Sequence, residues 1–301
     1  MLLLQKVKRR LPIHLHVLLG RCRNFLLTKS RDVLVPNSLY ANLSEFTSRD
    51  NCRRFFVFTL GRSGSNFLAK LLNAHAEVLC FHEGVRIQSY PVYPISERDR
   101  NRYAAYLLRD RFHDSYHTVG DVGSLAMDSI LRIPQGLAHR SILFRHPVRM
   151  LRTKMEMLRE EPREIDSVDQ IALRTQLEAA GLHALTTGSS MSAEDIYFLW
   201  TAVNWRSMGA AAFRFDSVIR LEDLSDELYA SRVLGAITGV EYASALIAQL
   251  LRRRVNTRTN QAELSEVEVL EQLGTKYREW YLQIVEPVAS KMGYGLYERK
   301  A

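Results

Sequence analysis

The chain has 301 residues, of which 47% are hydrophobic, so it can bury one or two sizeable cores and is not a disordered chain. Its 41 basic residues outnumber 33 acidic ones, and the formal net charge of +8 favours an anionic ligand or surface without specifying which. The three scattered cysteines, Cys22, Cys52 and Cys80, argue against a disulfide framework and a zinc site, and predict a reducing, cytoplasmic location.

Residues 1–50 are expected to form a basic arm ahead of the main domain. Two leucine-rich runs flank the basic stretch 6–10, but neither reaches membrane-spanning length. Pro12 interrupts the second run, and arginines follow it instead of a small-residue cleavage site, which argues against a signal peptide. The arm is therefore predicted to be a peripheral helix packed on the domain. A peripheral contact with a membrane surface is the alternative.

The strongest local pattern is a strand, a glycine loop and a helix. Residues 55–60 are apolar or β-favouring throughout, which is typical of a strand buried on both faces in a parallel sheet. The glycine loop covers residues 61–66, and apolar residues at helical spacing follow over 67–72. Backbone N–H groups, the helix dipole and Arg62 give such a loop positive character. The pattern predicts a loop that binds phosphate or sulfate.

The residues of this loop narrow the kind of anion. A Walker A loop carries a late lysine and a hydroxyl for magnesium, whereas here Arg62 precedes the second glycine, Gly64, and no Lys-Ser or Lys-Thr pair follows. The loop therefore favours a smaller anion bound without a metal over a triphosphate with magnesium. A plain strand-to-helix turn of an α/β protein is the alternative interpretation of the loop alone.

A second short strand is predicted over residues 77–81 and ends at His82-Glu83-Gly84. Ligands of open α/β sheets bind at the carboxyl ends of the strands. If the two strands are neighbours, His82 and Glu83 are therefore expected near the anion loop. A surface acid is the alternative interpretation of Glu83.

Residues 85–135 lose the strand pattern and are predicted to form a helical insertion that binds the acceptor. Arginines between positions 98 and 111 alternate with acidic residues, which favours a solvated helix face over a surface for nucleic acid. Because no repeat or nucleic-acid motif supports that alternative, no nucleic-acid partner is expected.

The next predicted strand covers residues 141–144 and ends at Arg145. Pro147 suits the first turn of the helix that follows, and Thr153 lies two turns along it. Arg145 and Thr153 are therefore expected to meet near the ligand-binding edge of the sheet. The alternative is that Arg145 pairs with a helix acid.

The remaining elements complete an α/β pattern. An amphipathic helix around residues 196–204 precedes a strand over 216–221, and arginines at 252–254 precede a polar loop. One long helix is predicted from Leu270 to near Gly293. Alternating strands and helices predict a three-layer α/β fold, with a central parallel sheet flanked by helices. No linker divides residues 51–301, so one domain is expected.

Three of these motifs together resemble the sulfotransferases that use 3′-phosphoadenosine-5′-phosphosulfate (PAPS), in particular the bacterial and Golgi carbohydrate type with an arginine in the loop. The motifs cover residues 59–68, 145–153 and 220–224, in the order of the family. Trp200 with Asn204 resembles a further helix of that family. The resemblance covers about residues 54–293 and implies a P-loop-like fold, with adenosine 3′,5′-bisphosphate as the product of the cofactor.

The resemblance also implies a role for individual residues. Arg62 matches the basic residue of the 5′-phosphosulfate loop, and Arg145 with Thr153 matches the 3′-phosphate site. Glu83 matches the glutamate that acts as general base, and His82 is the reserve candidate. The catalytic residues implied are Arg62, Glu83 and His82. The cofactor-binding residues implied are Gly61, Arg62, Ser63, Gly64, Ser65, Asn66, Phe67, Arg145, Thr153, Arg254 and Arg258.

The function implied is transfer of a sulfuryl group from PAPS to an acceptor hydroxyl, on a glycan, glycolipid or small metabolite, without a metal. Asn66 stands where the family usually has threonine or serine. Residues 120–124 resemble a Gly-Glu-Lys-Ser stretch of relatives, but Val122 replaces the basic residue and no role is assigned to the segment. The alternatives are a P-loop-like kinase and a non-catalytic protein that binds an anion or glycan on the same fold.

Overall fold

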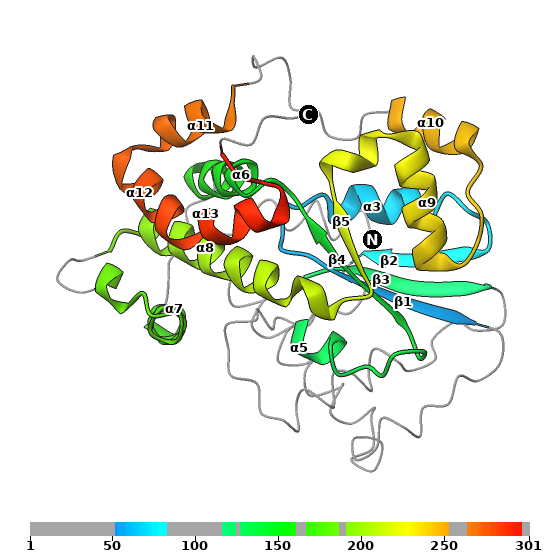
Figure 1. Cartoon of the computed structure of the whole chain (residues 1–301), viewed down its shortest axis with the longest axis horizontal. Helices are drawn as coiled ribbons and strands as arrows, with labels where there is room; N and C mark the ends of the chain where they lie inside the picture. The colour runs from blue at the N-terminus through cyan, green and yellow to red at the C-terminus, as the bar shows by residue number, and fades with distance from the viewer. Residues whose placement is uncertain are drawn as a thin grey trace, which may run out of the picture.

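A computed structural model of the protein describes residues 52–82, 116–124, 127–160, 167–186, 191–252 and 264–296. A parallel five-stranded sheet forms its centre, with the strand order β2-β3-β1-β4-β5 (Figure 1). The strands are β1 (Arg53–Phe58), β2 (Val78–His82), β3 (Thr118–Gly123), β4 (His139–Phe144) and β5 (Ser217–Arg220). The α-helices are α3 (Ser65–Leu72), α5 (Met127–Ile130), α6 (Pro147–Glu160), α7 (Ser167–Ala179), α8 (Ala193–Ala211), α9 (Glu227–Thr238), α10 (Ser244–Arg252), α11 (Glu266–Leu273), α12 (Thr275–Ile284) and α13 (Glu286–Ala289).

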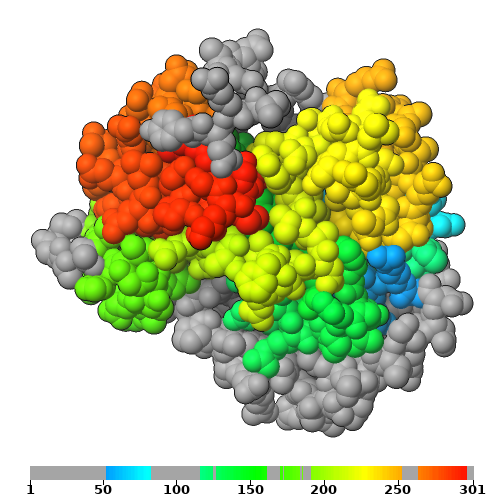
Figure 2. Space-filling view, in the orientation of Figure 1, coloured from blue at the N-terminus to red at the C-terminus, as the bar shows by residue number. Residues whose placement is uncertain are grey.

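Two hydrophobic cores cover the two faces of the sheet. Phe55 and Val57 of β1 pack with apolar side chains of α3, α9 and α10 on one face. Phe56 and Phe58 pack on the other face with α5, α6, α8 and the C-terminal helices. In Figure 2 the C-terminal helices, coloured orange and red, occupy one side of the visible face, and α9 with α10, in yellow and amber, occupies the other. The three-layer α/β fold predicted from the sequence is therefore confirmed.

Strand β1 is buried on both faces, as its apolar run predicts. Its four apolar residues, Phe55, Phe56, Val57 and Phe58, are at most 4% exposed. It pairs with β3 on one side and β4 on the other, so both edges of its backbone are hydrogen-bonded. This central position directs the segment that follows β1 to the middle of the carboxyl edge of the sheet.

Strand β3 lies between β1 and β2, and the prediction of a helical insertion over residues 85–135 is wrong for Thr118–Gly123. The strand lacks an apolar run, and Gly120 within it leaves room for the neighbouring Phe55. A Cβ on Gly120 would lie 2.5 Å from the Phe55 ring and 2.4 Å from the Phe55 carbonyl oxygen. Part of the predicted insertion, residues 85–115, lies outside the described residues.

The C-terminal region is divided into shorter helices, so the prediction of one long helix is wrong. Gly274 has a φ of 105° and separates α11 from α12. A second break at Val285 precedes α13, whose first turn contains Pro287, and the 3₁₀ helix η7 (Ser290–Met292) follows. Gly293 ends this region in a left-handed conformation, close to the predicted end.

The predicted N-terminal arm, residues 1–50, lies outside the described residues and stays a prediction. Within the described ranges, no helix combines the length and the apolar character that crossing a membrane requires. The described cysteines Cys52 and Cys80 are both free thiols. Burial raises the pKa of the Cys80 thiol, with a further contribution from the charge of Asp121.

Candidate anion-binding site

A tight loop connects β1 to α3 at the carboxyl edge of the sheet. Arg62 has a φ of 74° and Gly64 a φ of 86°, and Arg62 is the one non-glycine with positive φ among the described residues. The Ser63 N–H donates to the Leu60 carbonyl at 3.2 Å, which closes the turn. A left-handed non-glycine residue costs roughly 1–2 kcal/mol, and such strain is often found at ligand-binding loops. The loop conformation is therefore consistent with a binding role.

The first turn of α3 has no side-chain cap. Gly64 occupies the N-cap position and the first turn contains no acidic residue. The first N–H groups of a helix lack partners within the helix and carry its positive dipole end. Nothing in the first turn neutralises this positive end, so the turn is suited to an anion, as predicted from the sequence.

His82 reaches this loop although β3 separates β2 from β1. Its Nε2 lies 2.8 Å from Oγ of Ser65, the first residue of α3. The predicted proximity of His82 to the loop is therefore confirmed, although the condition attached to it, that the two strands are neighbours, is not met. Glu83 lies outside the described residues, so its position stays a prediction.

Arg145 follows the end of β4 and joins the loop to α6. Its Nη1 donates to the Arg62 carbonyl oxygen at 2.9 Å and approaches Thr153 Oγ1 at 3.4 Å. Burial lowers the pKa of Arg145. The negative charge of Glu222 acts in the opposite direction and raises this pKa, whereas the positive charge of Arg149 lowers it further. The predicted meeting of Arg145 and Thr153 is confirmed, and the hydrogen-bond acceptors of Arg145 are a carbonyl and a hydroxyl.

Side chains from two other elements, α8 and η6, hold the backbone around Arg145. Trp205 of α8 donates from Nε1 to the Arg145 carbonyl at 3.2 Å. Glu222, the first residue of the 3₁₀ helix η6 (Glu222–Ser225), accepts the His146 N–H at 2.8 Å and the Tyr294 hydroxyl at 3.0 Å. These hydrogen bonds hold the backbone at Arg145 in place and thereby position its side chain.

The residue next to Glu222 contacts the loop directly. The Leu221 side chain lies against Gly64, where an added Cβ would be 2.5 Å from Cδ1. Gly64 is therefore required by space as well as by its positive φ. The segment 220–224, recognised in the sequence as a motif, thus supports both the loop and the Arg145 junction.

Lys154 and Ser124 also lie at the loop: Lys154 was not predicted there, and Ser124 belongs to the segment 120–124, to which no role was assigned. A Cβ on Gly61 would be 3.1 Å from Lys154 Nζ and 3.9 Å from Ser124 Oγ. Lys154 follows Thr153 on α6, and this adjacency was the only signal in the sequence. The Arg62 side chain is exposed, and its Nη2 lies 3.0 Å from Met157 Sδ on the same helix.

The other predicted loop residues differ in whether their side chains face the core or the solvent. The Ser63 hydroxyl is buried and lies 3.4 Å from Met150 Sδ, so it faces the core rather than the open side of the loop. Asn66 is exposed on the first turn of α3, and Phe67 packs partly against the core. Arg254 and Arg258 lie outside the described residues.

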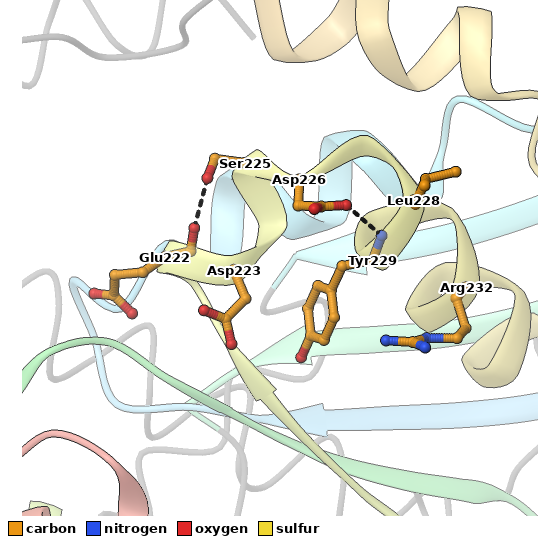
Figure 3. Close-up of a pocket in the computed structure, with 7 residues that line it drawn as sticks. All are labelled: Glu222, Asp223, Ser225, Asp226, Leu228, Tyr229 and Arg232. Atoms are coloured by element: carbon orange, nitrogen blue, oxygen red, sulfur yellow. Dashed lines mark hydrogen bonds between the residues drawn. The ribbon is translucent and has the colours of Figure 1, made fainter. Parts of the chain in front are cut away.

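A pocket of about 600 Å³ lies beside η6 (Figure 3). Its carboxylates already have partners: Glu222 as described, Asp226 with the Tyr229 N–H at 2.8 Å, and Asp223 with Arg220 at 3.5 Å. These contacts stabilise the turn and the start of α9, so we assign the pocket no chemistry. The lining residues are Glu222, Asp223, Ser225, Asp226, Leu228, Tyr229 and Arg232.

No protein-family model matches the sequence. No curated protein matches it either. Among solved structures, mouse sulfotransferase SULT7A1 complexed with PAP aligns with 80% of this chain and 83% of its own, at 11% sequence identity and a TM-score of 0.37. A likeness of this strength does not place the chain in that family.

Proposed function

We propose that the protein transfers a sulfuryl group from PAPS to an acceptor hydroxyl. The observation that carries the proposal is the position of Arg145, whose Nη1 contacts both the Arg62 carbonyl in the loop and Thr153 Oγ1 on α6. Two anion-binding places thus lie next to each other: the loop with the start of α3, and the guanidinium with the threonine. A nucleotide with separate 3′ and 5′ anionic groups matches this arrangement.

The residues present fit such a nucleotide. The uncapped start of α3 suits close approach of a 5′-phosphosulfate to the backbone, and Gly64 permits the left-handed turn that leads into it. Arg145 supplies a charged donor for the 3′-phosphate, and the Thr153 hydroxyl, which donates to the Arg149 carbonyl at 2.8 Å, would turn toward the phosphate as a second donor. These two groups account for the preference for a 3′-phosphorylated nucleotide that the proposal requires.

In the proposed reaction, the acceptor oxygen bonds to sulfur as the bond from sulfur to the 5′-phosphate oxygen breaks. The loop N–H groups and Arg62 would stabilise the negative charge that grows on that phosphate oxygen. Glu83 is the proposed base that takes the hydroxyl proton, with His82 as the reserve candidate. The contact of His82 with Ser65 supports a place for His82 at the site.

The proposed acceptors are glycans, glycolipids and small metabolites, and the arginine at position 62 supports the carbohydrate type. The proposed location is cytoplasmic, with a peripheral membrane contact through the N-terminal arm as a further proposal. Both rest on sequence features described above, namely the cysteine usage and the basic stretch 6–10.

The test is a mass-spectrometric screen of these three acceptor classes, each incubated with the protein and PAPS. We expect one class to gain the mass of a sulfuryl group with the parent protein, and Arg145→Met to lose most of that signal. Binding of adenosine 3′,5′-bisphosphate without transfer to any acceptor would favour the non-catalytic binding protein. Magnesium-dependent turnover of ATP would favour the kinase.

A further inference from the structure

Lys154 has a position at the anion loop that the proposed reaction does not yet use. It is half-buried on α6, and its side chain extends over Gly61: an added Cβ there would lie 3.1 Å from Nζ and 4.0 Å from Cε. Ser124 Oγ, from the end of β3, would lie 3.9 Å from the same point. An ammonium and a hydroxyl from two different elements therefore flank the first residue of the loop.

Arg62 does not occupy this position. Its guanidinium lies 3.0 Å from the sulfur of Met157, one helical turn beyond Lys154 on α6. A thioether is only a weak acceptor, so this contact gives the guanidinium little stabilisation. Of the two cations, Lys154 is the one that the structure holds over the loop backbone.

Helix α6 presents consecutive residues to the two anion-binding places. Neighbouring residues on an α-helix are rotated by about 100°, so the side chains of Thr153 and Lys154 leave α6 in different directions. Thr153 Oγ1 lies by Arg145, whereas Lys154 Nζ lies by Gly61. The helix therefore separates a hydroxyl for one anion from an ammonium for the other.

We propose that Lys154 is a binding residue for the anion on the loop. An anion bound to the N–H groups at the start of α3 keeps oxygen atoms that face away from the helix. The Lys154 ammonium, with three N–H donors, is placed to bind these oxygens. The identity of this anion as a 5′-phosphosulfate or 5′-phosphate rests on the proposed function, whereas the contact with Lys154 rests on geometry alone.

The test compares two nucleotides by calorimetry: adenosine 3′,5′-bisphosphate, which has an anion for the loop, and adenosine 3′-phosphate, which has none. Lys154→Met should weaken binding of the bisphosphate about tenfold to a hundredfold, the range for a lost charged hydrogen bond, and leave the 3′-phosphate unchanged. Lys154→Arg should restore most of the affinity. Lys70→Met is the matched control, because it removes the same charge from an exposed position on α3.

The outcomes separate this inference from the proposed function. If the parent binds the bisphosphate and Lys154→Met behaves like Lys70→Met, the role of Lys154 is overturned and the proposed function stands. An equal loss for both nucleotides also overturns it, because the effect is then not specific to the loop.

If the parent binds neither nucleotide, the proposed function fails. The same variants are then compared by the rise in Tm that inorganic sulfate produces. A rise that is lost in Lys154→Met and kept in Lys70→Met supports the contact, and a rise kept in both overturns it.

Discussion

The β1–α3 loop and the β4–α6 junction form the two halves of the site, and they are built in opposite ways. The loop depends on backbone shape, with left-handed residues at Arg62 and Gly64 and no side-chain cap on α3. The junction depends on side chains that support its backbone, from Trp205 and Glu222. We therefore expect substitutions that add side-chain atoms to the glycines to disrupt the loop. Substitutions that remove hydrogen-bond partners should disrupt the junction.

This difference decides which variants are informative. Backbone N–H donors are not removed by substitutions other than proline, which also restricts φ, so the loop is tested through its glycines. The junction presents a guanidinium whose supports can be removed one at a time. Loop and junction variants should differ most in the order Gly64→Ala, Glu222→Gln and Tyr294→Phe, and Asp216→Asn at the opposite end of β4 serves as a comparison outside the site.

Gly64→Ala should be the most damaging of these changes. The new Cβ would lie 2.5 Å from Leu221 Cδ1 at a φ of 86°, so left-handed strain and overpacking add to roughly 2–4 kcal/mol of lost unfolding free energy. Urea denaturation measures this loss. Gly136→Ala is the matched control, because Gly136 has a φ of 95° and nothing within 4 Å of an added Cβ. Equal losses of unfolding free energy for the two variants would mean that the contact with Leu221 adds no destabilisation.

Glu222→Gln should destabilise the junction by roughly 1–2 kcal/mol, because it replaces a charged acceptor of two hydrogen bonds by a neutral amide, at an exposed residue where water screens part of the effect. The two donors are the His146 N–H and the Tyr294 hydroxyl. The free energy of unfolding, measured by urea denaturation, and the affinity for adenosine 3′-phosphate should both fall. Asp223→Asn, at the neighbouring carboxylate of an exposed ion pair with Arg220, should change either quantity little. If Glu222→Gln and Asp223→Asn changed stability and affinity equally, Glu222 would not be a specific support of the junction.

Tyr294→Phe should cost about 1 kcal/mol, since it removes a single hydrogen bond to Glu222 and keeps the ring. The ring also lies 4.5 Å from the Arg220 guanidinium, and this contact should survive the change. In the Glu222→Gln background the same substitution should cost clearly less, because the two residues share one interaction. Full additivity in this double-mutant cycle would show that the two side chains act independently.

The opposite end of β4 offers a pH-dependent comparison with the junction. Burial alone would raise the pKa of Asp216, but hydrogen bonds from Arg140 outweigh it and the pKa is lowered. A lowered folded-state pKa stabilises the protein above the unfolded value of about 3.9, and this contribution disappears as pH falls through the folded value. The stability difference between the parent and Asp216→Asn should therefore be largest near neutral pH and narrow in acid. A difference that stays constant down to acid pH would contradict this assignment.

Local patterns allowed part of this structure to be predicted. The apolar run of β1 and the glycines after it are contiguous, so the strand, the loop and α3 could all be inferred. The position of Thr153 relative to Arg145 also follows from a single strand-to-helix segment. In each case, the chain segment itself sets the geometry.

The missed features depend on contacts between distant segments. Strand β3 has a glycine where Phe55 packs, and no local pattern reveals that neighbour. Lys154 reaches Gly61 only because α6 packs with a particular rotation, which spacing along the chain does not determine. Likewise, the place of β3 in the sheet comes from pairing on both sides.

We expect the hydrogen bond from Arg145 to the Arg62 carbonyl to couple the two halves of the candidate site thermodynamically. An anion bound beside Arg145 acts on the same guanidinium that holds the loop, so it changes how strongly the loop binds its own anion. By linkage, the loop anion must change the affinity beside Arg145 by the same factor. Adenosine 3′-phosphate and inorganic sulfate, offered together as separate fragments, should therefore bind with free energies that do not simply add.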